Sequence, residues 1–282
     1  MTNADVAAAS AAPKLPLTYL FVPGNRPDRF DKALASGAGA VIVDFEDAVA
    51  PADKAAARSG FAAWHRAAGN VAAHILVRIN DESTRWFEDD LELVRAVGVR
   101  GVVLPKAETV RGIDRVAASL ADDGYVVPLV ETALGIIGVE SIARAARVQR
   151  LAFGTLDYAL DLDLPGDDRG LLYPACRIAL ASRAAGVASP IAGVSPEIND
   201  EDKLLADLSF ARACGFGAKL CIHPKQVAPI HGALRPTTSE VAWATRVLAV
   251  AESREGAVQV DGKMVDRPVI AKALRILAHS ST

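Results

Sequence analysis

The chain has 282 residues and a mass of 29.5 kDa, and 51% of its residues are hydrophobic and 23% charged, which is typical of a globular protein and excludes a disordered or fibrous one. Its 31 Lys and Arg residues face 34 Asp and Glu residues, so no basic excess exists to neutralise a nucleic-acid backbone. Charge or proline interrupts every apolar stretch well before the roughly 20 residues of a membrane span, so neither nucleic acid nor membrane is an expected partner.

The first fourteen residues, 1–14, form an Ala-rich leader that we expect to be disordered. This leader has neither the basic region nor the apolar core of a secretory signal. The three cysteines, Cys176, Cys214 and Cys221, form no CxxC pair and predict buried thiols rather than a disulfide framework or a zinc site. These features indicate a cytoplasmic protein.

Eight short aliphatic runs predict eight buried parallel strands. Each run is almost continuously apolar, as expected for strands that are covered on both faces. The runs are Thr18–Val22, Ala40–Asp44, Ile75–Ile79, Gly101–Leu104, Val126–Val130, Leu151–Phe153, Ile191–Val194 and Ala218–Ile222.

Helical patterns lie between these runs, with proline near their starts and glycine after their ends. The first has Pro27 near its start and Gly37 after its end, and the second runs from Pro51 to just before Gly69. Eight strand–helix units in about 250 residues are typical of a (β/α)8 TIM barrel, which we predict over residues 15–235. A doubly wound sheet usually has fewer strands and often a glycine-rich phosphate turn.

Two further helices, at about 239–255 and 268–278, are surplus to a minimal barrel. We therefore predict that residues 236–282 form a C-terminal helical lid or an oligomerisation segment.

Charged and polar residues concentrate where the predicted strands end, which is the face that carries the active site in TIM barrels. The starts of the strands carry far fewer, mainly His74 and Lys219. The residues at the ends are Pro23–Arg26, Asp44–Asp47, Arg78–Asn80, Pro105–Lys106, Glu131–Thr132, Gly154–Asp157, Ser195–Glu197 and His223–Pro224.

Glu131 and Asp157 end neighbouring strands and form a pair of carboxylates. Mg2+ keeps several waters and takes one or two protein carboxylates together with substrate oxygens, so this pair suits it. The alternative is a pair of ordinary polar residues at strand ends.

An acidic corner follows the second strand, where Asp44, Glu46 and Asp47 lie close together. These acids can hold metal-bound waters, or Glu46 and Asp47 can serve solvation and surface ion pairs; for Asp44 we favour a functional role. Arg78 ends an apolar strand and needs a carboxylate partner, either that of a substrate or an internal one such as Asp44.

Two other residues at strand ends have alternative roles. Lys106 can form a Schiff base, although a lysine in this position is more often an ion-pair partner. His223 alone among the five histidines lies at a predicted strand exit, where an orienting or capping role is more common than a catalytic one.

Taken in order, these residues resemble the citrate lyase β-subunit-like family, which belongs to the HpcH/HpaI aldolase superfamily with malyl-CoA and citramalyl-CoA lyase relatives. The resemblance extends from about residue 17 to the last helix. The similar segments are Leu20-Phe-Val-Pro-Gly-Asn-Arg-Pro-Asp-Arg-Phe, Val43-Asp-Phe-Glu-Asp-Ala-Val, Val77-Arg-Ile-Asn, Val103-Leu-Pro-Lys, Val130-Glu-Thr-Ala, Phe153-Gly-Thr-Leu-Asp-Tyr, Cys221-Ile-His-Pro-Lys-Gln and Gly262-Lys-Met-Val-Asp-Arg-Pro.

The resemblance implies a Mg2+ cofactor with Glu131 and Asp157 as its ligands. It also implies that Arg78 binds the carboxylate of a small keto or hydroxy acid, beside Glu131. Arg26 corresponds to a residue near the CoA or substrate carbonyl.

Three acids complete the implied site. Asp44 and Asp47 correspond to acids that lie behind the metal ligands, and Asp266 corresponds to an aspartate that a neighbouring subunit contributes from its C-terminal lid. Members of the family are commonly trimers or higher assemblies, so the resemblance also implies a homotrimer or a higher homo-oligomer. One departure is Ile191-Ala192-Gly193, because many relatives have aspartate in the middle position.

The implied function is Mg2+-dependent carbon–carbon cleavage of a 3-hydroxyacyl-CoA thioester, of the malyl-CoA or citramalyl-CoA type, to acetyl-CoA and a 2-keto acid. The reverse condensation uses the same groups, and thioester hydrolysis can follow it. The alternatives are a class II aldolase acting on free 2-keto-3-hydroxy acids, the β subunit of a larger citrate lyase complex, and a binding barrel without turnover.

Overall fold

The computed structural model describes residues 15–69, 74–166, 169–252 and 259–280, so the predicted leader 1–14 lies outside the described residues. The described chain divides into two compact units. One is Pro16–Ile230, and the other contains the chain from His231 onward. Among the described residues, none of the helices combines the length and the apolarity required to span a bilayer.

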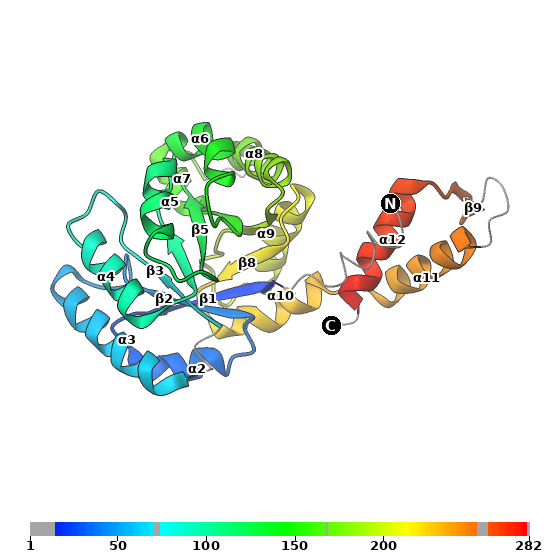
Figure 1. Ribbon diagram of the computed structural model, residues 1–282. Helices are drawn as coiled ribbons and strands as arrows, with labels where there is room; N and C mark the ends of the chain where they lie inside the picture. Colours follow the sequence, from blue (N-terminus) through cyan, green and yellow to red (C-terminus); the bar gives the residue numbers. More distant parts are fainter. Residues whose placement is uncertain (1–14, 70–73, 167–168, 253–258, 281–282) are drawn as a thin grey trace. The chain divides into compact units, whose positions relative to one another are not determined.

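The first unit is a closed barrel of eight parallel strands, which confirms the predicted TIM barrel (Figure 1). Each strand pairs with the next along the chain, and the last closes the barrel by pairing with the first. The strands are β1 (Thr18–Pro23), β2 (Ala40–Asp44), β3 (Ile75–Arg78), β4 (Gly101–Leu104), β5 (Tyr125–Val130), β6 (Arg150–Phe153), β7 (Ala188–Ala192) and β8 (Ala218–Cys221).

The seventh strand differs most from its predicted position, since it covers 188–192 rather than 191–194. Ala188 and Ile191 pair with Arg150 and Ala152 of β6, with a register shift between these two pairs. An irregular strand that begins on small residues gives no continuous apolar run from which to locate its start.

Helices surround the barrel and connect successive strands. Gly98, in the left-handed conformation at φ 72°, ends the helix before β4 and donates its N–H to Val94 O at 3.0 Å. The helices of this unit are α2 (Phe30–Leu34), α3 (Lys54–Ala68), α4 (Phe87–Val97), α5 (Val110–Ala117), α6 (Ala133–Ala143), α7 (Thr155–Asp161), α8 (Arg169–Ala185) and α9 (Glu201–Ala213). The boundary between the two units falls within α10 (Val227–Leu234).

Alternate residues of the strands fill the inside of the barrel. This core contains Tyr19, Ile42, Leu76 and Leu129, while the residues between them face the helices. Because the interior is packed with side chains, it forms a core rather than a channel, and the chemistry is confined to the ends of the strands.

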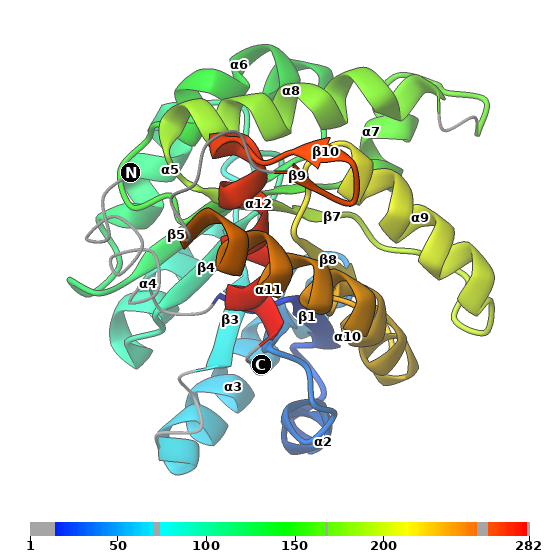
Figure 2. The ribbon, with the colours of Figure 1, turned by 90° about the vertical axis from the view of Figure 1, so that its right-hand side faces the viewer.

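The second unit is a helical pair with a short hairpin. Its elements are α11 (Thr238–Glu252), β9 (Gln259–Val260), β10 (Lys263–Met264) and α12 (Arg267–Ser280) (Figure 2). Ala244, Val247, Val260 and Ala273 form its buried core. Both C-terminal helices are therefore present, although residues 253–255 of the first prediction lie outside the described residues. A lid or oligomerisation role for this unit stays a prediction.

Candidate active site

The ends of β2 and β3 bring Asp44 and Arg78 side by side. The two residues are paired in the register of these parallel strands, so their side chains leave the sheet at the same level. Both are buried, at 3% and 9% exposure respectively. A buried arginine beside a buried aspartate forms the charged centre of the C-terminal face.

The Arg78 guanidinium lies among three carboxylates. Nε and Nη2 each donate a hydrogen bond to Asp44 at 2.7 Å, which is the two-pronged geometry that guanidinium and carboxylate groups favour. Nη1 lies 2.9 Å from Glu46 Oε2, and Nη2 lies 3.3 Å from Asp47 Oδ2. Burial lowers the pKa of Arg78, but these acids, above all Asp44, raise it above its ordinary value. The partner of Arg78 in this structure is thus internal.

Asp44 also organises the loop that follows it. Its two carboxylate oxygens accept hydrogen bonds from the backbone N–H groups of Glu46 at 2.9 Å and Ala48 at 3.1 Å. One side chain therefore anchors both Arg78 and the acidic loop, which is why a carboxylate is required at this position.

Lys54, at the start of α3, holds the same loop from the other side. Its Nζ donates to Phe45 O at 2.8 Å, Glu46 O at 3.0 Å and Asn80 Oδ1 at 2.6 Å. Asp90, which is fully buried in α4, accepts from the N–H and the Nδ2 of Asn80. Lys54 and Asp90 were missed in the sequence because both lie on helices, away from the strand ends, in no recognisable motif.

Glu131, which follows β5, is a buried carboxylate with one unused oxygen. Its Oε1 accepts a hydrogen bond from the Lys106 backbone N–H at 2.8 Å, but Oε2 has no hydrogen-bond partner. Burial, and next the neighbouring acids Asp157 and Glu46, raise the pKa of Glu131 to about 8, against the opposing effect of the Lys106 N–H. A buried carboxylate oxygen without a partner normally carries a large energetic penalty, and a bound cation removes it.

Asp157 lies in the first turn of α7 and is exposed. It is close enough to Glu131 to raise the pKa of that residue, so the two carboxylates share one region. In the described part of the chain, no three His, Cys, Asp or Glu residues are grouped to hold a metal ion. Two protein carboxylates, with water and substrate in the other positions, fit Mg2+ and do not fit a closed zinc site.

Gly154 leaves the space in which the Glu131 side chain lies. A Cβ at this position would overlap Glu131 Oε2, and it would lie 2.6 Å from Glu131 Cβ. Glycine is therefore required here by close approach and not by backbone conformation.

We expect Gly154→Ala to displace the Glu131 carboxylate and to weaken Mg2+ binding by about 10- to 100-fold, which is typical of lost ligand positioning. Isothermal titration with Mg2+ would measure this effect. The control is Gly232→Ala, because Gly232 has open space around it and no positive φ, and this variant should bind Mg2+ like the wild type. Gly166 is less suitable as a control, since its φ of +80° would strain an alanine. Unchanged affinity in Gly154→Ala would contradict the position given to Glu131.

The buried acids make the stability of the Mg2+-free protein dependent on pH. Burial raises the pKa of Glu46 to about 7 and that of Glu131 to about 8, from ordinary values of 4.5. Between pH 4.5 and 8 the folded protein therefore binds more protons than the unfolded chain, and the free energy of unfolding falls as pH rises.

We expect a fall of about 1.4 kcal/mol per pH unit for each of the two groups while it remains protonated in the folded state. Urea unfolding in EDTA at pH 5, 6, 7 and 8 measures the slope. In Glu131→Gln the dependence of the free energy of unfolding on pH should become weaker toward pH 8. A free energy of unfolding that is constant or rises between pH 5 and pH 8 in the wild type would contradict the burial of these acids.

Arg26 pairs with an acid two residues further along the chain, and Asp266 belongs to the second unit. Arg26, which is half-exposed, donates to Asp28 through Nε at 2.8 Å and Nη2 at 2.7 Å. Asp266 is exposed and accepts a hydrogen bond from the Val269 N–H at 3.1 Å, so it caps the start of α12. Their predicted roles toward a substrate stay predictions.

Lys106 and His223 have the ordinary roles that their positions favour. Lys106 Nζ lies 3.5 Å from Asp81 and 3.9 Å from Glu46. Although burial lowers the pKa of Lys106, these acids hold it above its ordinary value, which disfavours the neutral amine that a Schiff base needs. His223 accepts the Lys225 N–H through Nδ1 at 3.2 Å and caps the turn that follows β8.

The departure in the seventh strand has a structural counterpart. Ala192 pairs in register with Lys219 of β8, on the face of the barrel that points toward the helices. An aspartate at position 192 would lie beside the Lys219 ammonium. Here Asp207 of α9 is the acid that raises the pKa of Lys219 against the effect of burial.

A closed β/α barrel with a buried cluster of acids around one arginine at the carboxyl ends of its strands has the architecture of a TIM-barrel enzyme. The family model of HpcH/HpaI aldolase/citrate lyase matches residues 17–224, and the chain belongs to this family of carbon–carbon lyases.

Relatives of this chain align with it over nearly its whole length. A citrate lyase subunit beta-like protein from Deinococcus radiodurans is 36% identical over 96% of this chain and 100% of its own, and a (3S)-malyl-CoA thioesterase from Cereibacter sphaeroides is 32% identical over 93% and 94%. The crystal structure of CitE from Mycobacterium tuberculosis in complex with magnesium, acetoacetate and coenzyme A has a TM-score of 0.84 and 34% identity, covering 97% of this chain and 100% of that one.

Proposed function

We propose that the protein is a Mg2+-dependent lyase that cleaves a 3-hydroxyacyl-CoA thioester, of the malyl-CoA or citramalyl-CoA type, into acetyl-CoA and a 2-keto acid. The observation that carries this proposal is the buried Glu131 carboxylate with an unpartnered oxygen beside Asp157. The similarity to CitE bound to magnesium, acetoacetate and coenzyme A supports both the metal and the thioester.

Glu131 and Asp157 hold the metal ion in this proposal. When bound, Mg2+ supplies positive charge beside the hydroxyl oxygen on which negative charge develops as the carbon–carbon bond breaks. The Lys106 N–H and the space at Gly154 keep the Glu131 carboxylate oriented toward that position.

Arg78 binds the carboxylate of the acid portion through Nη1, because Nε and Nη2 are already bonded to Asp44. Glu46 now faces Nη1, and its pKa of about 7 means that protonation readily removes this competing charge. Asp44 and Asp47 fix the guanidinium, and Arg26 lies near the thioester carbonyl.

Asp266, supplied by the C-terminal unit of a neighbouring copy, accepts the hydroxyl proton. The hydroxyl carbon becomes the carbonyl of the 2-keto acid, and the bonding pair passes to the acetyl-CoA carbon as an enolate. Return of the proton to that carbon gives acetyl-CoA, so atoms and charge balance. This arrangement requires that copies of the chain associate, and we propose a homotrimer or a higher homo-oligomer in the cytoplasm.

Incubation with Mg2+ and, separately, malyl-CoA, citramalyl-CoA and citryl-CoA tests the reaction. Release of acetyl-CoA and a keto acid from one thioester, abolished by EDTA, is the expected result. Cleavage of none of them would contradict the proposal and leave an aldolase on free acids, a subunit of a larger citrate lyase complex, or a binding barrel.

Co-expression of two inactive variants tests whether subunits share a site. Asp266→Asn keeps a side chain that can cap α12, so its effect is chemical rather than structural. If Asp266 acts in a neighbouring barrel, mixed oligomers of Asp266→Asn and Glu131→Gln chains should recover part of the activity. Activity that stays at the level of the separate variants would contradict a site shared between subunits.

A further inference from the structure

A cavity of about 330 Å3 lies outside the barrel core, between β6, β7 and β8 and the helices α7, α8 and α9. Its lining includes Thr155 and Leu156, which directly precede Asp157, but none of the site carboxylates. The cavity is therefore separate from the metal and acid site described above, and no step of the proposed reaction uses it.

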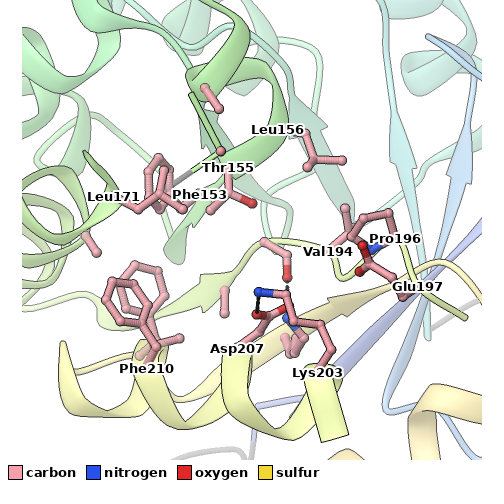
Figure 3. Close-up of a pocket in the computed structure, with 18 of the residues that line it drawn as sticks. Phe153, Thr155, Leu156, Leu171, Val194, Pro196, Glu197, Lys203, Asp207 and Phe210 are labelled. Atoms are coloured by element: carbon pink, nitrogen blue, oxygen red, sulfur yellow. Dashed lines mark hydrogen bonds and ion pairs between the residues drawn. The ribbon is translucent and has the colours of Figure 1, made fainter. Parts of the chain in front are cut away.

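One end of the cavity is apolar. Phe153, Leu171 and Phe210 lie together on one side, as Figure 3 shows, and Phe216 lies against Phe153 with a ring-centroid distance of 6.5 Å. An apolar wall with few polar groups is typical of a site for a small organic molecule.

The other end carries charged groups, two of which form an ion pair. Lys203 Nζ lies 2.8 Å from Asp207 Oδ1 (Figure 3). Ser195, which lies behind the lining, donates its hydroxyl to Asp207 Oδ2 at 2.5 Å. The Asp207 carboxylate thus has both a counter-charge and a hydrogen-bond donor.

Lys219 contributes a second ammonium group to the cavity. It is 2% exposed, and its Nζ donates to Gly193 O at 2.8 Å. No carboxylate in the described ranges forms an ion pair with it, and the residue beside it in the sheet is Ala192, which has no polar group. A buried ammonium with one neutral acceptor is incompletely satisfied, because it can donate three hydrogen bonds.

We propose that this cavity is a second binding site, for a small monocarboxylate with an apolar chain. The carboxylate of the ligand binds the Lys219 ammonium, and the hydrocarbon part of the ligand contacts the wall formed by Phe153, Phe210 and Phe216. Asp207 is already paired with Lys203, and Glu197, the other acid of the lining, is exposed. Lys219 is therefore the buried charge at this end of the cavity for which a ligand carboxylate would provide the counter-charge. A phosphate dianion would bring two negative charges close to Asp207 and is disfavoured.

The titration of Lys219 agrees with this assignment. Burial lowers its pKa to about 8 while Asp207 raises it, so the amine is mostly protonated at pH 7. A bound carboxylate favours the protonated form further.

Titration calorimetry of the full chain with hexanoate, in EDTA to prevent binding through a metal, tests the proposal. We expect saturable binding of one hexanoate per protein chain. The affinity for hexanol should be lower by about tenfold or more, because hexanol lacks the negative charge. The matched pair is Ala192→Asp and Ala192→Asn, which have similar size and differ in charge. Ala192→Asp places a carboxylate beside Lys219 and should abolish hexanoate binding, whereas Ala192→Asn should retain it.

Lys219→Met provides a second test and should weaken hexanoate about tenfold or more while leaving hexanol unaffected. If that variant fails to fold, the Ala192 pair still decides. Equal binding of hexanol and hexanoate, equal behaviour of the two Ala192 variants, or no saturable binding of hexanoate would each overturn the proposal. Because the readout is binding in EDTA, its failure is distinct from failure of the lyase reaction.

Discussion

Replacing Glu131 with glutamine is expected to lower the rate of thioester cleavage about a thousandfold or more. If Glu131 holds Mg2+ as proposed, loss of this charged ligand removes several kcal/mol of stabilisation from the developing alkoxide. The glutamine amide preserves the shape of the Glu131 side chain, but it carries no negative charge with which to bind Mg2+. The rate of keto-acid release at saturating Mg2+, together with Mg2+ affinity by calorimetry, measures both consequences.

A matched control is Glu140→Gln on α6, where the side chain is 62% exposed and pairs with Arg177. This variant should keep wild-type activity and Mg2+ affinity, because exposed ion pairs contribute little. A Glu131→Gln enzyme with normal Mg2+ affinity would exclude Glu131 as a ligand. Normal affinity combined with lost activity would place the metal elsewhere and leave Glu131 a different role.

Replacing Arg78 with methionine is expected to lower the free energy of unfolding by about 3–5 kcal/mol, the usual cost of removing one partner from a buried ion pair. The variant leaves the Asp44 and Glu46 carboxylates buried without their shared counter-charge, although methionine fills part of the volume. Urea unfolding at pH 7 in EDTA measures the difference.

Arg78→Met with Asp44→Asn should recover part of the lost stability, because the second change removes one uncompensated charge. The control is Arg100→Met, since Arg100 and Asp123 form an exposed pair 2.8 Å apart, and its effect should stay below about 1 kcal/mol. Similar destabilisation by Arg78→Met and Arg100→Met would contradict the buried cluster.

The barrel was predictable because each strand carries its own signal. Aliphatic runs of three to five residues, separated by helices with glycine at their ends, indicate a parallel sheet, and eight of them indicate closure. The exception, β7, shows the limit of that signal, because its first residues are small or polar and its pairing with β6 is irregular.

The positions of the candidate site were predictable for a related reason. All C-terminal ends of parallel strands in a barrel lie on one face, so Asp44, Arg78 and Glu131 share it whatever the details of packing. Their partners were not predictable. Whether Arg78 faces a substrate or Asp44 depends on strand register, and Lys54 and Asp90 reach the site from helices.

The amino-acid sequence by itself determined the class of fold, the face that carries the charges and the family, because these depend on local patterns and short motifs. Only the tertiary structure decided which charges are compensated: Arg78 by three acids, Glu131 Oε2 by none, and Lys219 by a single carbonyl. Compensation depends on distances between residues remote in the chain and on the removal of water around them, and neither is written in any local stretch of residues.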